Sequence, residues 1–314
     1  ISRTSVMTYK GSEKTIPEIA RELEVAYVLE GSVRRAAGRV RVTAQLIHAA
    51  TDDHMWADSY ERRLTDIFGI QSEVAHAIGQ ELQAELSTAV RDRIETAPTT
   101  DLRAYESFLK GRALLDQRTA EPVRQAIDFF QGAIERDPSY GLAWAGLADA
   151  LSLLAYYDYA IPDSVPTALE AAGRAVKLAP ELGQTHASLG IAHSLRQNGP
   201  AALQELERAI RLTPSYAEAQ SWLGWVHLMT GSPGRAVRPA EEAVELDPLA
   251  PAYRAYLSEI RLANGDLEGA LPEAQRAAEL EAGNLEADLE SNREDEIGQL
   301  YSAFDEMRES LRDT

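Results

Sequence analysis

A period of 34 residues in the second half of the chain constrains the fold more than any other feature of the sequence. Pro180, Pro214 and Pro248 are 34 residues apart, and an alanine stands five residues before each of them. Small residues at fixed positions allow paired helices to approach closely, and a proline ends each second helix. The period therefore predicts a series of helical hairpins. Because no single hairpin can bury its apolar face alone, the copies must stack into a solenoid.

Five copies of this pattern fit the sequence between residues 104 and 284. The second copy carries an insertion at Tyr156–Pro166, and the fifth has Glu281-Ala282 where the others have a residue followed by proline. The pattern resembles the tetratricopeptide repeat. That resemblance implies a mainly α protein with a right-handed α-solenoid, in which the first helix of each hairpin lines a concave binding face. The predicted boundaries are 104–140, 141–182, 183–216, 217–250 and 251–284.

Six residues are predicted to lie near the concave face of the solenoid. They are Arg112, Asp149, Ser194, Trp225, Met229 and Glu259. A tryptophan and a methionine exposed in a groove can anchor an extended peptide or a helix. The alternative for Trp225 is packing between the fourth and fifth hairpins, and both interpretations stay open here.

The chemistry of the expected partner follows from charge and from the resemblance. Family members that clamp a free carboxy terminus use lysine and asparagine where this chain has Ala145, Ala187 and Asp149, so such peptides are not the expected ligands. The net charge of −19 favours a protein or peptide partner with basic patches. An acidic chain also repels nucleic acid, because phosphate binding needs clustered lysine and arginine.

Residues 1–88 have the pattern of a mixed α/β domain. Thr15 and Glu18 have the spacing of a capping box, which predicts the start of a helix. Alternation of apolar and polar residues at 39–46 predicts a half-buried strand, joined to a preceding strand by the turn Ala36-Ala37-Gly38. HMWADSYER is a predicted third strand. A helix is expected next, with an apolar stripe made of Ile67, Ile70, Val74, Ile78 and Leu82.

This amino-terminal part resembles the TolB-like domain that precedes helical repeats in many bacterial signalling proteins, including chains of the adenylate-cyclase and kinase types. The matching segments are SRTSVMTYKG, IARELEVAYVLEGSVRR and VRVTAQLIHAATDDHMWADSYERRLTDIFGIQSEVA. Members of that family usually begin with a further strand and helix. The resemblance therefore implies a TolB-like domain at 1–88 that is truncated at its front, followed by a linker at 89–103.

The last segment of the chain follows a different period. Five apolar residues are spaced 3, 4, 3 and 4 apart, which is the seam of a heptad helix. DEIG at 295–298 and GNLEADL at 283–289 resemble the second helix of a HAMP signal-relay domain and the connector before it. Residues 285–314 are therefore expected to form a HAMP-like acidic helix. The seam residues are Ile297, Leu300, Phe304, Met307 and Leu311.

Charge at this carboxy-terminal segment bears on oligomeric state. Eleven acidic and three basic residues after Leu280 give it a net charge of −8. Two heptads bury too little surface for strong pairing, and the charge repels a second copy. The expectation is a mainly monomeric protein, and weak dimerisation through the seam is the alternative.

The sequence predicts no catalytic centre, no cofactor and no metal site. It has no phosphate-binding glycine loop, no HExxH motif, no nucleophile elbow and no cysteine. His193 and His227 are interpreted as packing residues, with a metal site as the alternative. His186 lies seven residues before His193, but two ligands on one helix do not make a zinc site without a third. Four arginines around the first hairpin are interpreted as a solvated face; they are Arg34, Arg35, Arg39 and Arg41. No apolar run of 18 residues and no signal peptide is present, so we expect a cytoplasmic chain without direct membrane insertion.

Taken together, these patterns predict a non-enzymatic interaction module from a bacterial signalling protein. It would act as a scaffold or sensor that binds a peptide or protein in the solenoid groove. The alternative is the regulatory carboxy-terminal half of an adenylate cyclase or protein kinase whose catalytic domain lies upstream of residue 1.

Overall fold

The computed structural model describes residues 5–6, 9, 12–36, 38–63, 66–83, 88–156 and 163–285. The chain divides into two compact units. One is an α/β unit made of residues 9–105, and the other is a helical unit made of residues 1–8 and 106–314. Both match the predicted fold class, which is mainly α with a small α/β part at the amino terminus.

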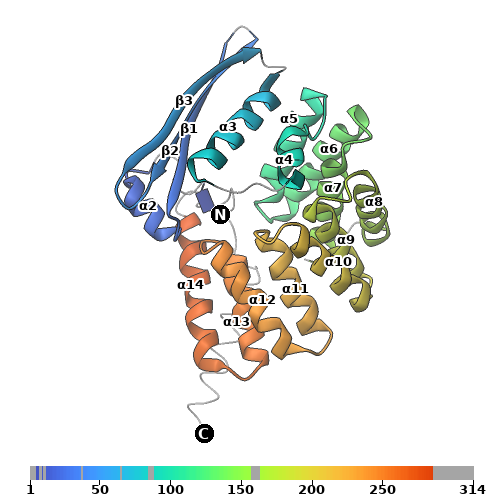
Figure 1. Ribbon diagram of the computed structural model, residues 1–314. Coiled ribbons are helices and arrows are strands. Elements are labelled where there is room, and N and C mark those ends of the chain that lie inside the picture. The colour runs from blue at the N-terminus through green and yellow to red at the C-terminus, as the bar shows by residue number, and fades with distance from the viewer. Residues whose placement is uncertain are drawn as a thin grey trace. The chain divides into compact units, whose positions relative to one another are not determined.

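The α/β unit is built on a three-stranded antiparallel sheet in the order β1-β2-β3 (Figure 1). In this sheet Val33 pairs with Val42, which in turn pairs with Tyr60. The turn between the first two strands passes Gly38 at φ +76°, a conformation that glycine adopts without strain. The hairpin predicted from the alternating pattern is therefore confirmed. The strands are β1 (Tyr27–Ala36), β2 (Arg39–His48) and β3 (Asp53–Arg63).

Helix α2 (Ile16–Glu22) begins where the capping box predicted it. The Glu18 carboxylate accepts hydrogen bonds from the Thr15 amide and hydroxyl, both at 2.8 Å. Asp52 lies in the turn before β3, at φ +56°.

Helix α3 (Ile67–Glu81) packs on β2 and β3 through the predicted apolar stripe. Ile67, Ile70 and Val74 contact a cluster that contains Val40 and Tyr60. The stripe ends earlier than expected, because Leu82 is the C-cap rather than a helical residue, and Gln83 turns the chain at φ +50°. The apolar face of α3 is therefore one turn shorter than predicted.

The predicted linker contains a short helix, α4 (Thr88–Glu95), that the sequence pattern did not predict. Val90 and Ile94 are four residues apart and half-buried, which gives the short helix one apolar side. The Ser72 hydroxyl of α3 donates a hydrogen bond to the Ile94 carbonyl at 2.6 Å and ties the two helices together.

Ten helices in the described chain form the five hairpins of the helical unit. The prolines of the 34-residue period follow the second helices of the second, third and fourth hairpins. The fifth hairpin lacks this proline, and its second helix continues to Leu285, into the segment that resembles a HAMP connector. The helices are α5 (Leu102–Leu115), α6 (Ala120–Arg136), α7 (Gly141–Tyr156), α8 (Ser164–Leu178), α9 (Gly183–Leu195), α10 (Gly199–Leu212), α11 (Ala217–Met229), α12 (Pro233–Leu246), α13 (Pro251–Ala263) and α14 (Leu267–Leu285).

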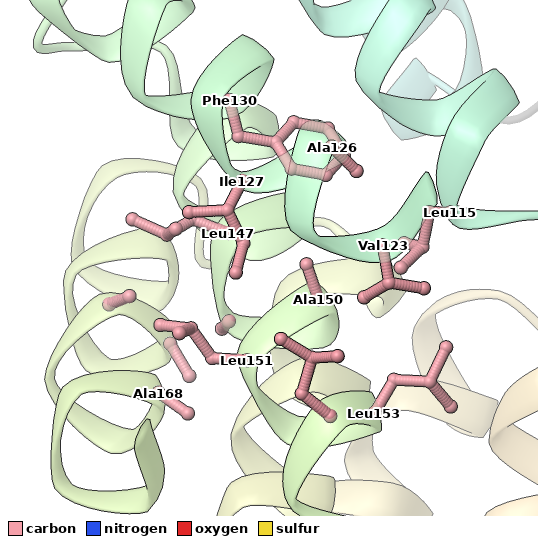
Figure 2. Close-up of a cluster of buried hydrophobic side chains, with 14 of the residues drawn as sticks. Leu115, Val123, Ala126, Ile127, Phe130, Leu147, Ala150, Leu151, Leu153 and Ala168 are labelled. Atoms are coloured by element: carbon pink, nitrogen blue, oxygen red, sulfur yellow. The ribbon is translucent and has the colours of Figure 1, made fainter. Parts of the chain in front are cut away.

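Small residues allow the close helix packing that the period predicts. Ala175, Ala209 and Ala243 are fully buried. The ring of Phe130 lies between Gly111 of α5 and Gly146 of α7, and a Cβ atom on either glycine would come within 2.7 Å of it. Figure 2 shows this ring among the aliphatic side chains of the first two hairpins.

The packing of the helices shows which face of the solenoid is the inner one. Helix α7 packs on α9, α9 on α11 and α11 on α13, so the first helices of successive hairpins contact one another. Within the described chain no comparable packing joins one second helix to the next. The array therefore curves with the first helices inside. Among the described helices, none combines the length and apolar character that a membrane span requires.

Candidate functional site

The inner face of the solenoid carries a cluster of charged residues drawn from three hairpins. Arg112 of α5 lies 3.7 Å from Asp149 of α7 and 3.8 Å from Asp116. Arg118, in the turn after α5, lies 3.5 Å from Glu218 in the first turn of α11. This last ion pair joins the first hairpin to the fourth, across the inner face of the solenoid. We call these five residues the inner charged cluster.

Asp149 is the carboxylate of the cluster whose pKa departs most from its usual value. Its side chain is only 11% exposed. Burial raises the pKa of this carboxyl to about 7, and repulsion by Glu218 adds to the rise while Arg112 opposes it. Among the described residues, its Oδ1 atom has no hydrogen-bond partner. The site therefore favours either a proton on Asp149 or an additional cation beside it.

Two tyrosines border the inner charged cluster: Tyr216 is half-buried and Tyr253 is buried. The Tyr216 hydroxyl donates a hydrogen bond to Glu218 at 2.9 Å. Burial, followed by repulsion from Glu218, raises the pKa of both Tyr216 and Tyr253. Both hydroxyls therefore stay protonated at neutral pH. Nearby, buried Asp247 accepts a hydrogen bond from the hydroxyl of Ser5, which brings the amino-terminal segment of the helical unit into contact with the solenoid.

Next to the charges, four aromatic side chains pack across the coil. Tyr156 of α7 lies edge-on to Trp222 and Trp225 of α11, at ring-centroid distances of 5.5 and 5.6 Å. Trp225 also packs against Tyr256 of α13 at 5.7 Å. Such pairs stabilise by about 0.5–1.5 kcal/mol beyond the burial of their area. This aromatic quartet links the second, fourth and fifth hairpins.

The six predicted groove residues fall into different environments. Arg112 and Asp149 belong to the inner charged cluster, and Trp225 belongs to the aromatic quartet, where it is half-buried. Met229, one turn further along α11, is 67% exposed. The Ser194 hydroxyl donates to the Ile191 carbonyl at 2.7 Å, within its own helix. Glu259 is half-buried on α13.

The structure thus brings Arg112 together with Asp149, and Trp225 close to Met229. Packing of Trp225 between the fourth and fifth hairpins is observed, and a role of this residue in partner binding stays a prediction. The predicted seam from Ile297 to Leu311 lies outside the described residues.

Several residues of the site were not predicted from the sequence. They are Asp116, Arg118, Tyr156, Tyr216, Glu218, Trp222, Tyr253 and Tyr256. The repeat register locates residues on the first helices, but it carries no information on contacts between hairpins that are not neighbours. Tyr216 and Glu218 follow Pro214, a proline of the 34-residue period, by two and four residues. Their place just after this proline is the feature of the sequence that could have located them.

Other polar groups are satisfied by structural roles. Both ring nitrogens of His186 have partners, the Glu205 carboxylate at 2.6 Å and the Pro180 carbonyl at 3.0 Å. Arg39 and Arg41 pair with Glu61 on the exposed sheet surface. Across the described residues, no group of three or more potential ligands could hold a metal ion.

An open depression of about 300 Å³ lies between α10 and α12, away from the inner charged cluster. Its lining includes Ile210, Leu223 and Pro239. Glu242 at its wall accepts hydrogen bonds from Gln220 at 2.6 Å and Arg238 at 2.9 Å, so these polar groups are already paired. The inner face is the stronger candidate site.

Two family models match parts of the chain. The tetratricopeptide repeat model matches residues 188–251 and 230–287. The HAMP domain model matches residues 274–313 and begins within α14, before the predicted boundary at 285. These matches confirm the resemblances that the 34-residue period and the DEIG segment indicated, and they support a protein-interaction or signalling module.

One curated relative is similar over much of the chain. It is "Putative adenylate cyclase 3" from Rhizobium meliloti (strain 1021), 36% identical over 200 residues. The match includes 62% of this chain and 33% of the relative, so the chain spans about a third of that protein's length.

Solved structures of helical-repeat proteins are also similar. A thermophilic TPR protein of Thermus thermophilus is 22% identical, with 58% of this chain and 94% of that chain covered and a TM-score of 0.49. MamA from Desulfovibrio magneticus RS-1 is 18% identical, with 58% and 97% covered and a TM-score of 0.39. YrrB, described as a TPR protein with an unusual peptide-binding site, is 18% identical, with 62% and 92% covered and a TM-score of 0.35. These are resemblances of fold.

Proposed function

We propose that the chain is the partner-binding module of a bacterial signalling protein and that the inner face of its solenoid receives a basic segment of another protein. The observation that carries the proposal is Asp149, a buried carboxylate with an unpartnered oxygen and a pKa raised to about 7. A buried charge without full pairing is costly, so a cation placed beside it would be stabilising.

The charge balance of the inner charged cluster favours a basic partner. When Asp149 is ionised, three carboxylates face two guanidinium groups, which leaves an acidic excess of one in a chain of net charge −19. A lysine or arginine of the partner would neutralise that excess and donate a hydrogen bond to Asp149. Opposite charge on the two proteins would also accelerate their association.

Apolar contacts would complete the binding surface. Met229 is 67% exposed, and Trp225 on the same helix keeps part of its ring accessible. An unbranched methionine beside an aromatic ring adapts to apolar side chains of different shapes. In the proposal, a partner segment presents an apolar residue to this pair and a basic residue to the inner charged cluster.

Binding of synthetic peptides tests the proposal. We expect a fluorescent peptide library with alternating arginine and leucine positions to bind the full chain more tightly than a matched library with glutamate in place of arginine. Asp149→Asn should weaken binding of the basic library by about tenfold, the loss of one charge-assisted hydrogen bond. Glu135→Gln removes a carboxylate of α6, outside the inner charged cluster, and should change binding less than twofold. Equal binding of both libraries would contradict the proposal.

A second candidate function is regulation of a nucleotide cyclase. The observation that favours it is the identity of 36% to a protein named as a putative adenylate cyclase, of which the chain spans about a third. In this proposal, residues 1–88 are a TolB-like domain, the repeats are a sensor, and the module works in the cytoplasm on a catalytic domain elsewhere in the protein. Protein kinase regulation is the other form of this candidate.

Nucleotide measurements separate these roles. We expect the purified chain alone to convert no ATP to cyclic AMP. Added to the catalytic domain encoded by the same gene, it should change the rate of cyclic AMP formation if it is the regulatory part of a cyclase. An unchanged rate at saturating chain concentration would remove the cyclase candidate and leave the partner-binding proposal standing.

A further inference from the structure

Strand β1 is an edge strand of the described sheet in the α/β unit, because among the described residues no strand pairs with its other long side. The Ala49 amide donates to the Ala26 carbonyl at 2.9 Å, and the register continues without a shift through Ala36 and Arg39. In an antiparallel ladder, alternate residues bond to the neighbouring strand. The even-numbered residues of β1 therefore bond to β2, and the odd-numbered residues point their N–H and C=O groups toward the open edge.

The same odd-numbered residues present an apolar row. Tyr27, Leu29 and Val33 are 41%, 50% and 65% exposed. Their partners in β2 include Leu46 and Val42, so the row lies on the sheet face that α3 covers. Among the described elements, helix α3 packs on β2 and β3 and has no comparable packing on β1. An edge that is both apolar and unpaired invites another strand, and soluble proteins usually block it.

We propose that β1 pairs antiparallel with β1 of a second copy, about a two-fold axis at Gly31, to form a continuous six-stranded sheet. Gly31 is near the middle of β1, so residues 27–35 of the two copies overlap fully. Leu29 of one protomer then lies opposite the partner's Val33, and the reverse pair forms on the other side of the axis. Five outward-facing residues from each copy exchange about ten backbone hydrogen bonds.

Charge complementarity identifies the second copy as the occupant. Glu30 and Arg34 lie on the opposite face from the apolar row, and both are exposed. With Gly31 on the axis, Glu30 is diagonal to the partner's Arg34, a separation that long side chains bridge. The pair forms twice by symmetry. In the described part of the chain Arg34 takes part in no ion pair, whereas Arg39 and Arg41 do. Parallel pairing would instead place like charges together.

This dimer differs from the one considered for the carboxy-terminal seam. It uses β1 only and does not require the tail. The chain's charge of −19 opposes association, so moderate salt should strengthen the dimer by screening repulsion between the two copies.

Sedimentation equilibrium of the full chain over a range of concentrations tests the proposal. The expected mass approaches twice 34.4 kDa as concentration rises, and the dissociation constant falls with added salt. Val33→Lys, at a side chain 65% exposed, should raise the dissociation constant at least tenfold, and its thermal midpoint should equal that of the wild type at concentrations where both are monomeric. Leu300→Lys in the predicted seam and Met229→Lys on the solenoid are matched controls and should leave it unchanged. A mass of 34.4 kDa throughout, or loss of the dimer in Leu300→Lys but not in Val33→Lys, would overturn the proposal.

Cross-linking tests the register, because the chain has no cysteine of its own. Opposed residues of an antiparallel pair are close enough for a disulfide. A mixture of Leu29→Cys and Val33→Cys chains should form a disulfide-linked heterodimer on mild oxidation, while either variant alone should not. Cross-linking of either variant with itself, or no cross-link in the mixture, would contradict pairing about Gly31.

Discussion

The close packing of Phe130 against Gly146 predicts that Gly146→Ala destabilises the protein, whereas the same substitution at Gly173 stabilises it. Gly146→Ala would place a Cβ atom 2.5 Å from Cε1 and 2.7 Å from Cζ of the Phe130 ring. The ring is fully buried and meets Gly111 on its other side, so it cannot retreat. Gly173→Ala, on α8, places its Cβ where no atom lies within 4 Å. Both glycines are inside helices, so the gain in helix propensity is common to the two variants.

The magnitudes follow from this comparison. Replacing glycine by alanine within a helix stabilises by about 1 kcal/mol when the space is free. Overpacking in a well-packed core costs about 1–3 kcal/mol. We therefore expect Gly173→Ala to raise the free energy of unfolding by up to about 1 kcal/mol. Gly146→Ala should fall below it by about 1–3 kcal/mol, because the propensity gain cancels in the difference.

Urea unfolding followed by circular dichroism measures both variants. A rescue adds a second observation: Phe130→Leu should cost less in the Gly146→Ala background than in the wild type, with a coupling of at least about 1 kcal/mol. If Gly146→Ala is as stable as Gly173→Ala, or if the double-mutant cycle is additive, the close packing of this ring is not what holds the first two hairpins together.

Three further predictions concern the inner face. The folded-state pKa of Asp149, about 7, lies above its usual value near 4, so the stability that its protonated form contributes is complete below pH 4 and is lost as pH rises through 7. Asp149→Asn should therefore remove a pH dependence of at most about 4 kcal/mol from the free energy of unfolding, measured at about pH 4.5, 6 and 8. A double-mutant cycle of Arg118→Ala and Glu218→Ala should give a coupling of about 1 kcal/mol in thermal melts, and additivity would mean that the cross-coil ion pair contributes nothing. Trp225→Ala should lower the free energy of unfolding by about 3 kcal/mol through lost aromatic packing. Met229 is exposed, so Met229→Ala should change that free energy by less than about 0.5 kcal/mol. Similar losses in the two variants would contradict the observed difference in burial.

Much of the architecture could be predicted because it depends on local rules. The period of prolines and small residues identified the hairpins, since Pro180, Pro214 and Pro248 follow second helices in the structure. Alternation at 39–46 identified the sheet, and the capping box identified α2. Helix α4 was missed, because two half-buried apolar residues in an eight-residue helix give a weak periodic signal and its hydrogen bond to Ser72 is a tertiary contact.

The site was predictable only in part, for a physical reason. The repeat register placed Arg112, Asp149 and Trp225 on first helices, which is a matter of position within one hairpin. Their partners across the coil depend on how tightly the whole solenoid curves. That curvature is the sum of small rotations between neighbouring hairpins, and the sequence of any one repeat does not specify it.

The contacts across the coil change how the repeats should fold. A repeat array with neighbour contacts alone behaves as a one-dimensional chain, in which terminal units open independently of the centre. Here Tyr156 of the second hairpin contacts Tyr256 of the fifth, and Arg118 of the first pairs with Glu218 of the fourth. Opening of either end therefore also removes contacts from hairpins that are distant in sequence. Amide hydrogen exchange should accordingly show α7, α11 and α13 opening as one cooperative unit, and folding should be slower than that of an array of equal length with local contacts only.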